Sequence, residues 1–335
     1  MKMSPTLNIF KLLPKGVDNA KNNSDLIIPI NKEVTIMELY ANLHTHSTHS
    51  DGGYDPAQMA RVCKEEGYSA VALTDHDIAT GYPELKAACD ELGMECLFGA
   101  EFSSPSKLLV DYAGPLEPTF HIVGFHFDPE YPPMKQYLID MGIRETEQTH
   151  TLFDRGVRLG KIKGIDWDEV LDYNKGIRWL CNMHLWRAML AKGLLTPEDR
   201  GWFWKELFAE HRHEVPPHRE FKQEHEIIQL IRDAGGIAIL AHPHQQLKHM
   251  DALIEMGLEG LEVWHSMMTE PEREQALKLA YQRNLYISGG SDHEGLCDGA
   301  YAAKKKPGDH GYFPPRSLGT TKQYYEEIRD RKLNR

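Results

Sequence analysis

From residue 38 onward, short apolar runs that suit β-strands alternate with longer segments of helical pattern. This alternation favours parallel β/α units, because each helix crosses back over the sheet to begin the next parallel strand. Several such units predict a barrel-like β/α fold whose functional face lies at the carboxyl ends of the strands. The expected strands are Glu38–Leu43, Ala70–Thr74, Glu95–Ala100, Phe120–Phe125, Ile237–Ala241, Gly260–Trp264 and Tyr286–Gly289, with helices Pro56–Glu66, Pro83–Leu92, Glu224–Ala234 and Pro271–Arg283 between several of them.

The alternation stops between residues 129 and 221, where helical patterns follow one another without a strand. We interpret 129–221 as a helical insertion that caps the barrel mouth; a separate domain is the alternative. Residues 1–37 are expected to form an irregular extension, and 38–335 the barrel domain. The helices expected in the insertion are Pro133–Leu159, Asp166–Tyr173, Asn182–Lys192 and Pro197–Arg212.

Composition limits the kind of partner. The chain has 335 residues, 41% of them hydrophobic, which is enough for a sizeable core. Its net charge of −12, from 50 acidic and 38 basic residues, argues against a broad grip on nucleic-acid phosphates. The five cysteines are dispersed, which is typical of reduced thiols, and no apolar run is long enough for a membrane span. We therefore expect a cytoplasmic protein that binds a small molecule and neither membranes nor, stably, nucleic acid.

Two histidines follow the first expected strand. His44 and His46 are two residues apart and would project to the same side of an extended chain. Imidazole nitrogens are ligands for zinc, iron and manganese, and the carboxylate of Asp51 could supply a third ligand. Taken alone, the pair could equally well form hydrogen bonds within a loop. The residues at the other strand ends distinguish metal binding from hydrogen bonding within a loop.

The later strands also end in residues that can bind metals. Each of these residues has an ordinary alternative role, such as capping a helix or satisfying a buried carbonyl. Together with His44 and His46 after the first strand, such residues recur on six strands, which predicts a site with nitrogen and oxygen ligands for more than one ion. These residues are Asp75, His76 and Asp77 on the second strand end, Glu101 on the third, His121 on the fourth, His242 and His244 on the fifth, and Asp292 and His293 on the last.

As a set, these motifs resemble the PHP (polymerase and histidinol phosphatase) family of metal-dependent phosphoesterases, over about residues 38–295. The resemblance implies a distorted, TIM-like (β/α)7 barrel with a trinuclear centre, holding two to three divalent ions of Mn, Zn or Fe. It rests on His44-Thr45-His46, Asp51, Thr74-Asp75-His76-Asp77, Gly99-Ala100-Glu101, His121, His242-Pro243 and Gly290-Ser291-Asp292. The metal ligands it implies are His44, His46, Asp51, His76, Glu101, His121, His242 and Asp292.

His293 departs from the family pattern. The usual last motif places one residue between the aspartate and the final histidine, whereas Asp292 and His293 are adjacent here. Neighbouring residues at a strand end point in different directions. His293 is therefore expected to bind metal only if the backbone turns sharply, and otherwise to support the site from outside.

The resemblance is to stand-alone members that act on small phosphate esters, and it predicts hydrolysis by a metal-activated hydroxide. We expect His265 to protonate the leaving group, and Asp75 to orient a ligating histidine. Arg178, His184 and Arg187, in the insertion, are the candidate substrate contacts; an ordinary helix surface is the alternative for them.

Two other functions stay open. One is an amidohydrolase-like enzyme that cleaves C–N bonds, and the other is a metal-bound PHP module without catalysis in a larger assembly. The sequence does not distinguish histidinol phosphate, nucleotide 3′,5′-bisphosphates, monophosphates or cyclic phosphates as the substrate. It also does not predict an oligomeric state.

Overall fold

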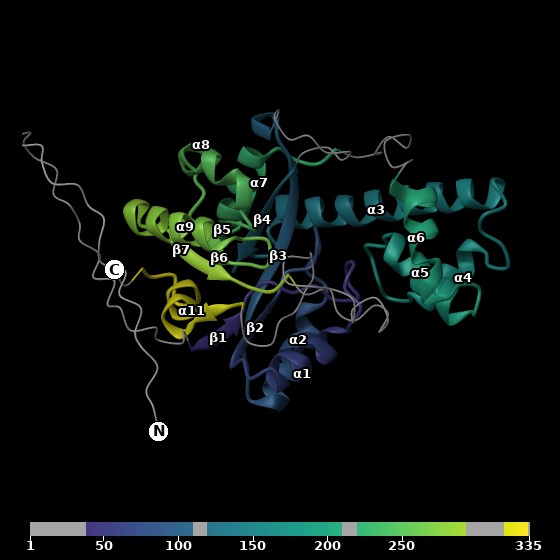
Figure 1. The fold of residues 1–335 in the computed structure, drawn as a ribbon, viewed down its shortest axis with the longest axis horizontal. Helices are drawn as coiled ribbons and strands as arrows, with labels where there is room; N and C mark the ends of the chain where they lie inside the picture. The colour runs from purple at the N-terminus through teal and green to yellow at the C-terminus, as the bar shows by residue number, and fades with distance from the viewer. Residues whose placement is uncertain (1–37, 110–118, 210–219, 293–317, 334–335) are drawn as a thin grey trace, which may run out of the picture. The chain divides into compact units, whose positions relative to one another are not determined.

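One sheet organises the molecule. The computed structural model describes residues 38–109, 119–209, 220–292 and 318–333 (Figure 1). Its eight strands lie in the order β7-β6-β5-β4-β3-β2-β1-β8. Their bounds are β1 Leu39–Asn42, β2 Ala70–Leu73, β3 Glu95–Pro105, β4 Thr119–Phe125, β5 Ile237–Leu240, β6 Gly260–Trp264, β7 Tyr286–Gly289 and β8 Thr320–Thr321.

The sheet closes on itself between β1 and β7. The amide of Leu43 donates to the carbonyl of Gly289 at 3.2 Å, and the amide of Asp292 donates to the carbonyl of His44 at 2.9 Å. These bonds connect the carboxyl ends of β1 and β7, which are far apart in the sheet order. The predicted barrel-like α/β fold is confirmed.

The direction of β4 differs from the predicted parallel arrangement. β1, β2 and β3 run parallel to one another, as do β5, β6 and β7, but β4 is antiparallel to both β3 and β5. A parallel partner would need a crossover helix, whereas an antiparallel one does not. Between Pro105 and Thr119 the described residues form only a 3-10 turn, Lys107–Leu109. The reversal brings the beginning of β4, with His121, toward the edge where the parallel strands end.

The helices around the barrel begin and end where local signals place them. Asp55 caps α1 in a capping box with Gln58, and a proline follows at the first helical position. Asn284 ends α9 in the left-handed region. The helices outside the insertion are α1 Pro56–Glu65, α2 Tyr82–Leu92, α7 Glu224–Asp233, the 3-10 helix η5 His244–His249, α8 Met250–Glu255, α9 Glu270–Arg283 and α11 Lys322–Arg329.

Between β4 and β5 the described residues form helices and no strand. The expected helix Pro197–Arg212 is broken into a 3-10 turn, a short α-turn and a π-helix. α3 extends from the sheet to the other helices of this segment (Figure 1). No helix among the described residues has the length and apolar character needed to cross a membrane. The elements are α3 Pro132–Arg158, α4 Trp167–Tyr173, α5 Asn182–Ala191, η2 Pro197–Asp199, α6 Arg200–Trp202 and the π-helix η3 Phe203–Ala209.

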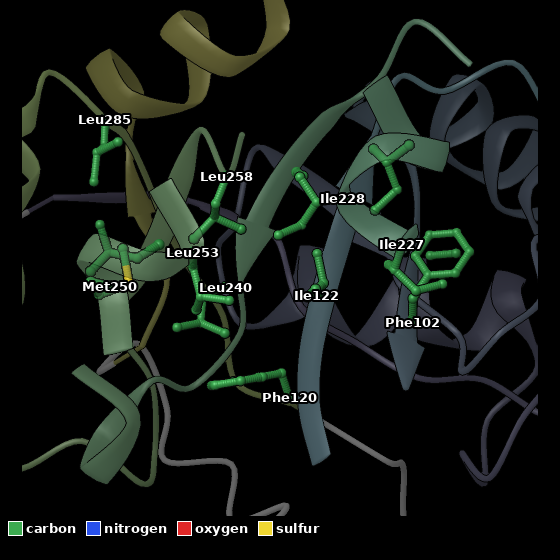
Figure 2. Close-up of a cluster of buried hydrophobic side chains, with 14 of the residues drawn as sticks. Phe102, Phe120, Ile122, Ile227, Ile228, Leu240, Met250, Leu253, Leu258 and Leu285 are labelled. Carbon is green, nitrogen blue, oxygen red and sulfur yellow. The ribbon is translucent and has the colours of Figure 1, made fainter. Parts of the chain in front are cut away.

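The largest apolar cluster fixes the helices that follow β4 and β5. Phe102 of β3 and Ile122 of β4 face Ile227 and Ile228 of α7 (Figure 2). These side chains are fully buried. A separate buried cluster around Trp186 joins the helices of the segment between β4 and β5. The proposed domain boundaries at 37 and 129–221 stay predictions.

Candidate metal centre

The predicted ligands meet at one end of the barrel. His44 and His46 follow β1, His76 follows β2, and Glu101 lies on β3. Their side chains form overlapping groups in which the nitrogen and oxygen atoms lie within 4.8 Å of one another. His121, His242 and Asp292 join them from β4 and from the ends of β5 and β7, and Asp51 joins from the loop after His46.

One buried group has four ligand atoms. His44 Nε2 lies 3.2 Å from His46 Nε2, 3.3 Å from Glu101 Oε2 and 3.4 Å from Asp292 Oδ1. His46 Nε2 lies 3.3 Å from Glu101 Oε2 and 3.0 Å from Asp292 Oδ1. A tetrahedral zinc site with bonds of about 2.0–2.1 Å has ligand atoms roughly 3.3–3.4 Å apart. These five separations are therefore close to the edges of a tetrahedron of that size.

Glu101 connects the groups. Its Oε2 lies 3.2 Å from His76 Nδ1, in addition to the contacts with His44 and His46. Its Oε1 lies 3.0 Å from His121 Nδ1 and 3.1 Å from His242 Nε2. A carboxylate with imidazoles at both oxygens can bridge neighbouring ions.

The centre has a sealed side and an open side. The side chains of His44 and His46 are 0% and 1% exposed, whereas His76 is 17% exposed and Asp51 and His121 are each 26% exposed. Among the described residues, the side of Asp51, His76 and His121 is therefore the most open to a substrate.

On the sealed side, buried imidazoles and carboxylates shift one another's pKa values. Burial alone would lower the pKa of His44, but the carboxylates of Glu262 and Glu101 outweigh it and raise the pKa well above the ordinary value. Burial would likewise lower the pKa of His46, but the adjacent carboxylates of Asp292 and Glu101 outweigh it and raise the pKa well above the ordinary value. Burial would raise the pKa of Glu101, yet the surrounding imidazoles hold it well below its usual value.

The residues fit divalent metal ions. His46 Nδ1, His76 Nδ1 and Glu101 Oε2 are buried and have no hydrogen-bond partner among the described residues. Buried polar atoms are seldom left in this state. The groups contain histidine and carboxylate atoms and no thiolate, which is the donor set that zinc, manganese or iron accept in a catalytic site.

Close backbone approaches hold the ligand loops. A Cβ added to Gly290 would lie 2.3 Å from the backbone nitrogen of His44, and one added to Gly52 would lie 2.3 Å from the carbonyl oxygen of His46. Beside Gly290, the side-chain nitrogen Nδ2 of Asn42 donates to Ser291 Oγ at 2.8 Å. Glycine is required at both positions because the ligand segments pass directly over them.

Sequence reasoning missed Glu262. This residue lies in the middle of β6 and is 0% exposed. Its Oε1 lies 3.0 Å from His44 Nδ1, and its Oε2 accepts from the backbone amide of His242 at 2.8 Å. A carboxylate inside an otherwise apolar strand was the signal that could have identified it, because such groups are rarely buried without partners.

The two residues expected to take part in catalysis lie next to the ligands. His265 is fully buried, with Nε2 3.3 Å from Asp292 Oδ2, and its Nδ1 accepts from the amide of Met267. Asp75 accepts hydrogen bonds from Ser47 and Ser50, at 2.6–2.8 Å, so it holds the loop before Asp51 rather than a histidine ring.

The expected substrate contacts of the insertion divide into two kinds. His184 Nε2 lies 2.9 Å from the carbonyl of Thr48, and Arg187 donates to the carbonyl of Asp51 at 2.7 Å. Both residues of α5 therefore hold the loop that carries Asp51. Arg178 is exposed and precedes Trp179, whose ring stacks on His76 at 6.2 Å.

Two further histidines complete the comparison with the prediction. His244 pairs with Glu272 through its Nδ1 at 2.7 Å and is not part of the ligand groups among the described residues. His293 lies outside the described residues.

Comparison with known proteins places this centre in a family. The family model of the PHP domain matches residues 42–184, which include the candidate ligands from His44 to His121. Residues 42–184 carry a PHP domain. The remaining candidate ligands, His242 and Asp292, lie beyond the matched region and contact the same cluster in the structure.

Three relatives cover most of the chain. A 5′-3′ exoribonuclease of Haemophilus influenzae is 27% identical over 266 residues, 76% of this chain and 90% of its own. A phosphoribosyl 1,2-cyclic phosphate 1,2-diphosphodiesterase of Eggerthella lenta is 25% identical over 256 residues, 76% and 94% of the two chains. A crystal structure from Bifidobacterium adolescentis, of a protein assigned to the metal-dependent phosphoesterases, has a TM-score of 0.68 at 25% identity and covers 89% of this chain and 98% of its own.

Proposed function

We infer that this chain is a metal-dependent phosphoesterase, and we propose that its substrate is a small phosphate ester. The observation that carries the inference is Glu101, a buried carboxylate with imidazoles of four strands around its two oxygens. The PHP match and a relative named as a phosphodiesterase support the same chemistry.

The ligand set has room for more than one ion. We propose two to three divalent ions of Mn, Zn or Fe. Four overlapping groups of possible ligands occur among the described residues, and three of them support a trinuclear centre: His44/His46/Glu101/Asp292, His46/Asp51/His76 and His76/Glu101/His121; the fourth is His44/Glu262/His265. When bound, such ions supply Lewis-acid activation of water and neutralise charge at phosphorus.

The chain's own residues would orient the substrate and exclude water. Asp51, His76 and His121 form the exposed edge, so the phosphate would bind there. Trp179 would cover His76 from the insertion, and we keep Arg178, which precedes it, as a proposed contact to a non-bridging oxygen or a second anionic group. His184 and Arg187 would act by holding the Asp51 loop.

Proton transfer to the leaving group stays a prediction for His265. Its Nδ1 accepts a backbone hydrogen bond, so in the neutral ring the proton lies on Nε2, toward Asp292. We propose that His265 holds Asp292 first, and that it donates a proton only if the leaving oxygen comes within reach. Asp75 would keep the Ser47–Ser50 loop in place.

The first experiment combines metal loading with a substrate panel. Purified protein with Mn²⁺ should release phosphate or nitrophenol from p-nitrophenyl phosphate, bis-p-nitrophenyl phosphate or a nucleoside monophosphate. The double variant His44→Ala, His46→Ala should lose this activity while keeping its circular dichroism spectrum. Undiminished turnover in the double variant would disprove the mechanism, and hydrolysis of cyclic amides without phosphate release would favour the C–N alternative.

A short RNA is the second candidate substrate, because one relative is named an exoribonuclease. The net charge of −12 favours a small ester over an extended strand, since strand binding relies on many cationic contacts. A 5′-phosphorylated oligonucleotide in the same panel distinguishes the two substrates. If the protein shortens the oligonucleotide faster than it hydrolyses the small esters, RNA becomes the preferred candidate.

We also propose a cytoplasmic location, in keeping with the free thiols of the described cysteines.

A further inference from the structure

Glu262 is an acidic residue in a setting that normally excludes charge. It lies on β6, all five residues of which are buried, and its side chain is 1% exposed. An ionised carboxylate in such a place is costly unless both oxygens find strong partners. The partners it has therefore explain why a charge is kept there.

Each oxygen of Glu262 holds a different ligand segment. Oε1 lies 3.0 Å from Nδ1 of His44, and Oε2 accepts the backbone amide of His242 at 2.8 Å. His44 follows β1 and His242 follows β5, and these two strands are not neighbours in the sheet. One carboxylate thus connects two ligand segments across the interior of the barrel.

The contact with His44 fixes which ring nitrogen can bind metal. A carboxylate can only accept a hydrogen bond, so Nδ1 of His44 must donate. In the neutral ring this leaves the lone pair on Nε2. Nε2 is the atom that faces His46, Glu101 and Asp292 at 3.2–3.4 Å.

The contact with His242 acts on the backbone. His242 has a φ of 28°, in the left-handed region that side-chain-bearing residues rarely adopt. A conformation of this kind persists only where its surroundings hold it. The hydrogen bond from its amide to Glu262 is one such restraint, and the turned residue directs Nε2 to Glu101 at 3.1 Å.

We propose that Glu262 is a positioning residue for the metal centre, which sets the Nε2 lone pair of His44 and the turned backbone of His242 at the same time. The inference rests on the metal binding of the proposed function, but not on the identity of the substrate. Partners of this kind behind metal ligands typically change metal affinity by roughly 10–100-fold when removed.

The variant Glu262→Gln keeps the shape of the side chain and removes one of its two acceptors. An amide oxygen can serve His44 or His242, but the amide nitrogen then faces a second donor. Zinc affinity, measured by competition with a chromophoric chelator, should fall roughly 10–100-fold. Glu327→Gln is the matched control: Glu327 is also 0% exposed, on α11, and its Oε1 accepts from Gln323. It should keep the affinity of the unmodified protein.

Each outcome decides the matter. Equal zinc affinity in Glu262→Gln and the unmodified protein, or an equal loss in Glu327→Gln, overturns the inference while leaving the phosphoesterase proposal intact. An unmodified protein that binds no divalent ion defeats both. Should Glu262→Gln fail to fold, ¹⁵N NMR of histidine in the zinc-loaded unmodified protein still tests the idea, because a proton on Nε2 of His44 contradicts it and one on Nδ1 supports it.

Discussion

His44 and His46 are imidazoles without solvent contact that face carboxylates, and this arrangement raises their pKa values well above the ordinary value of about 6.5. A group with a raised pKa keeps its proton to a higher pH than usual. Metal binding needs the neutral nitrogen, so each ion must displace protons. We therefore expect metal binding near pH 7 to release protons, and the apparent affinity to decrease as the pH falls.

Calorimetric titration with Zn²⁺ in two buffers of different ionisation enthalpy measures this release. His44→Ala should release fewer protons, whereas His150→Ala, an exposed histidine on α3 stacked against Trp167, should release as many as the unmodified protein. A binding heat that is independent of the buffer would contradict the prediction.

At the scale of residues, the members of the candidate metal centre could be picked out because each carries a local signal. Histidine and carboxylate side chains in or near short apolar runs can be recognised in the sequence without knowing how the strands pair. Glu262 could not be assigned a role in this way, since its partners follow β1 and β5. The same is true of Gly290, whose close approach to His44 exists only once the barrel has closed.

Among the elements, α5 is the one whose role changed most between sequence and structure. Its His184 and Arg187 were expected to contact the substrate, and the structure places them on the carbonyls of Thr48 and Asp51. Removing either contact should let the Asp51 carboxylate move. For His184→Ala we expect a metal affinity about tenfold weaker and a lower kcat.

Metal content by mass spectrometry, together with kcat and KM, tests this role of α5. His225→Ala, in the first turn of α7 and exposed, is the control on another helix. A raised KM with unchanged metal content and kcat would instead mean that His184 contacts the substrate directly.

The elements also show where sequence patterns stop being informative. The alternation of apolar runs and helices predicted the strands of the barrel, because burial and periodicity are local properties. The direction of β4 is not local: it depends on β3 and β5, its neighbours on either side. The end of the insertion was predicted as one helix and forms a π-helix after two short turns, where Phe203, Leu207 and Phe208 are buried in the cluster of this segment.

For the whole molecule, the ligand arrangement couples metal binding to the stability of the barrel. The candidate ligands come from or directly after β1, β2, β3, β4, β5 and β7, so bound ions would connect most of the sheet. The unfolded chain cannot bring these residues together, and a ligand that binds only the folded state stabilises it by about 2.7 kcal/mol at 100 times its dissociation constant. Saturating Mn²⁺ should therefore raise the melting temperature, and a chelator should lower it.

The double variant His44→Ala, His46→Ala separates this coupling from a general salt effect. It removes the two imidazoles of the buried group His44/His46/Glu101/Asp292 and leaves the exposed edge of Asp51, His76 and His121 in place. Its melting temperature without metal should be close to or above that of the metal-free unmodified protein, because the crowded imidazoles and carboxylates are costly to bury. Its response to Mn²⁺ should be much smaller. Differential scanning calorimetry measures both melting temperatures. If Mn²⁺ raises the melting temperature equally in both proteins, the ions act elsewhere on the surface and the stability of the barrel does not depend on the metal centre.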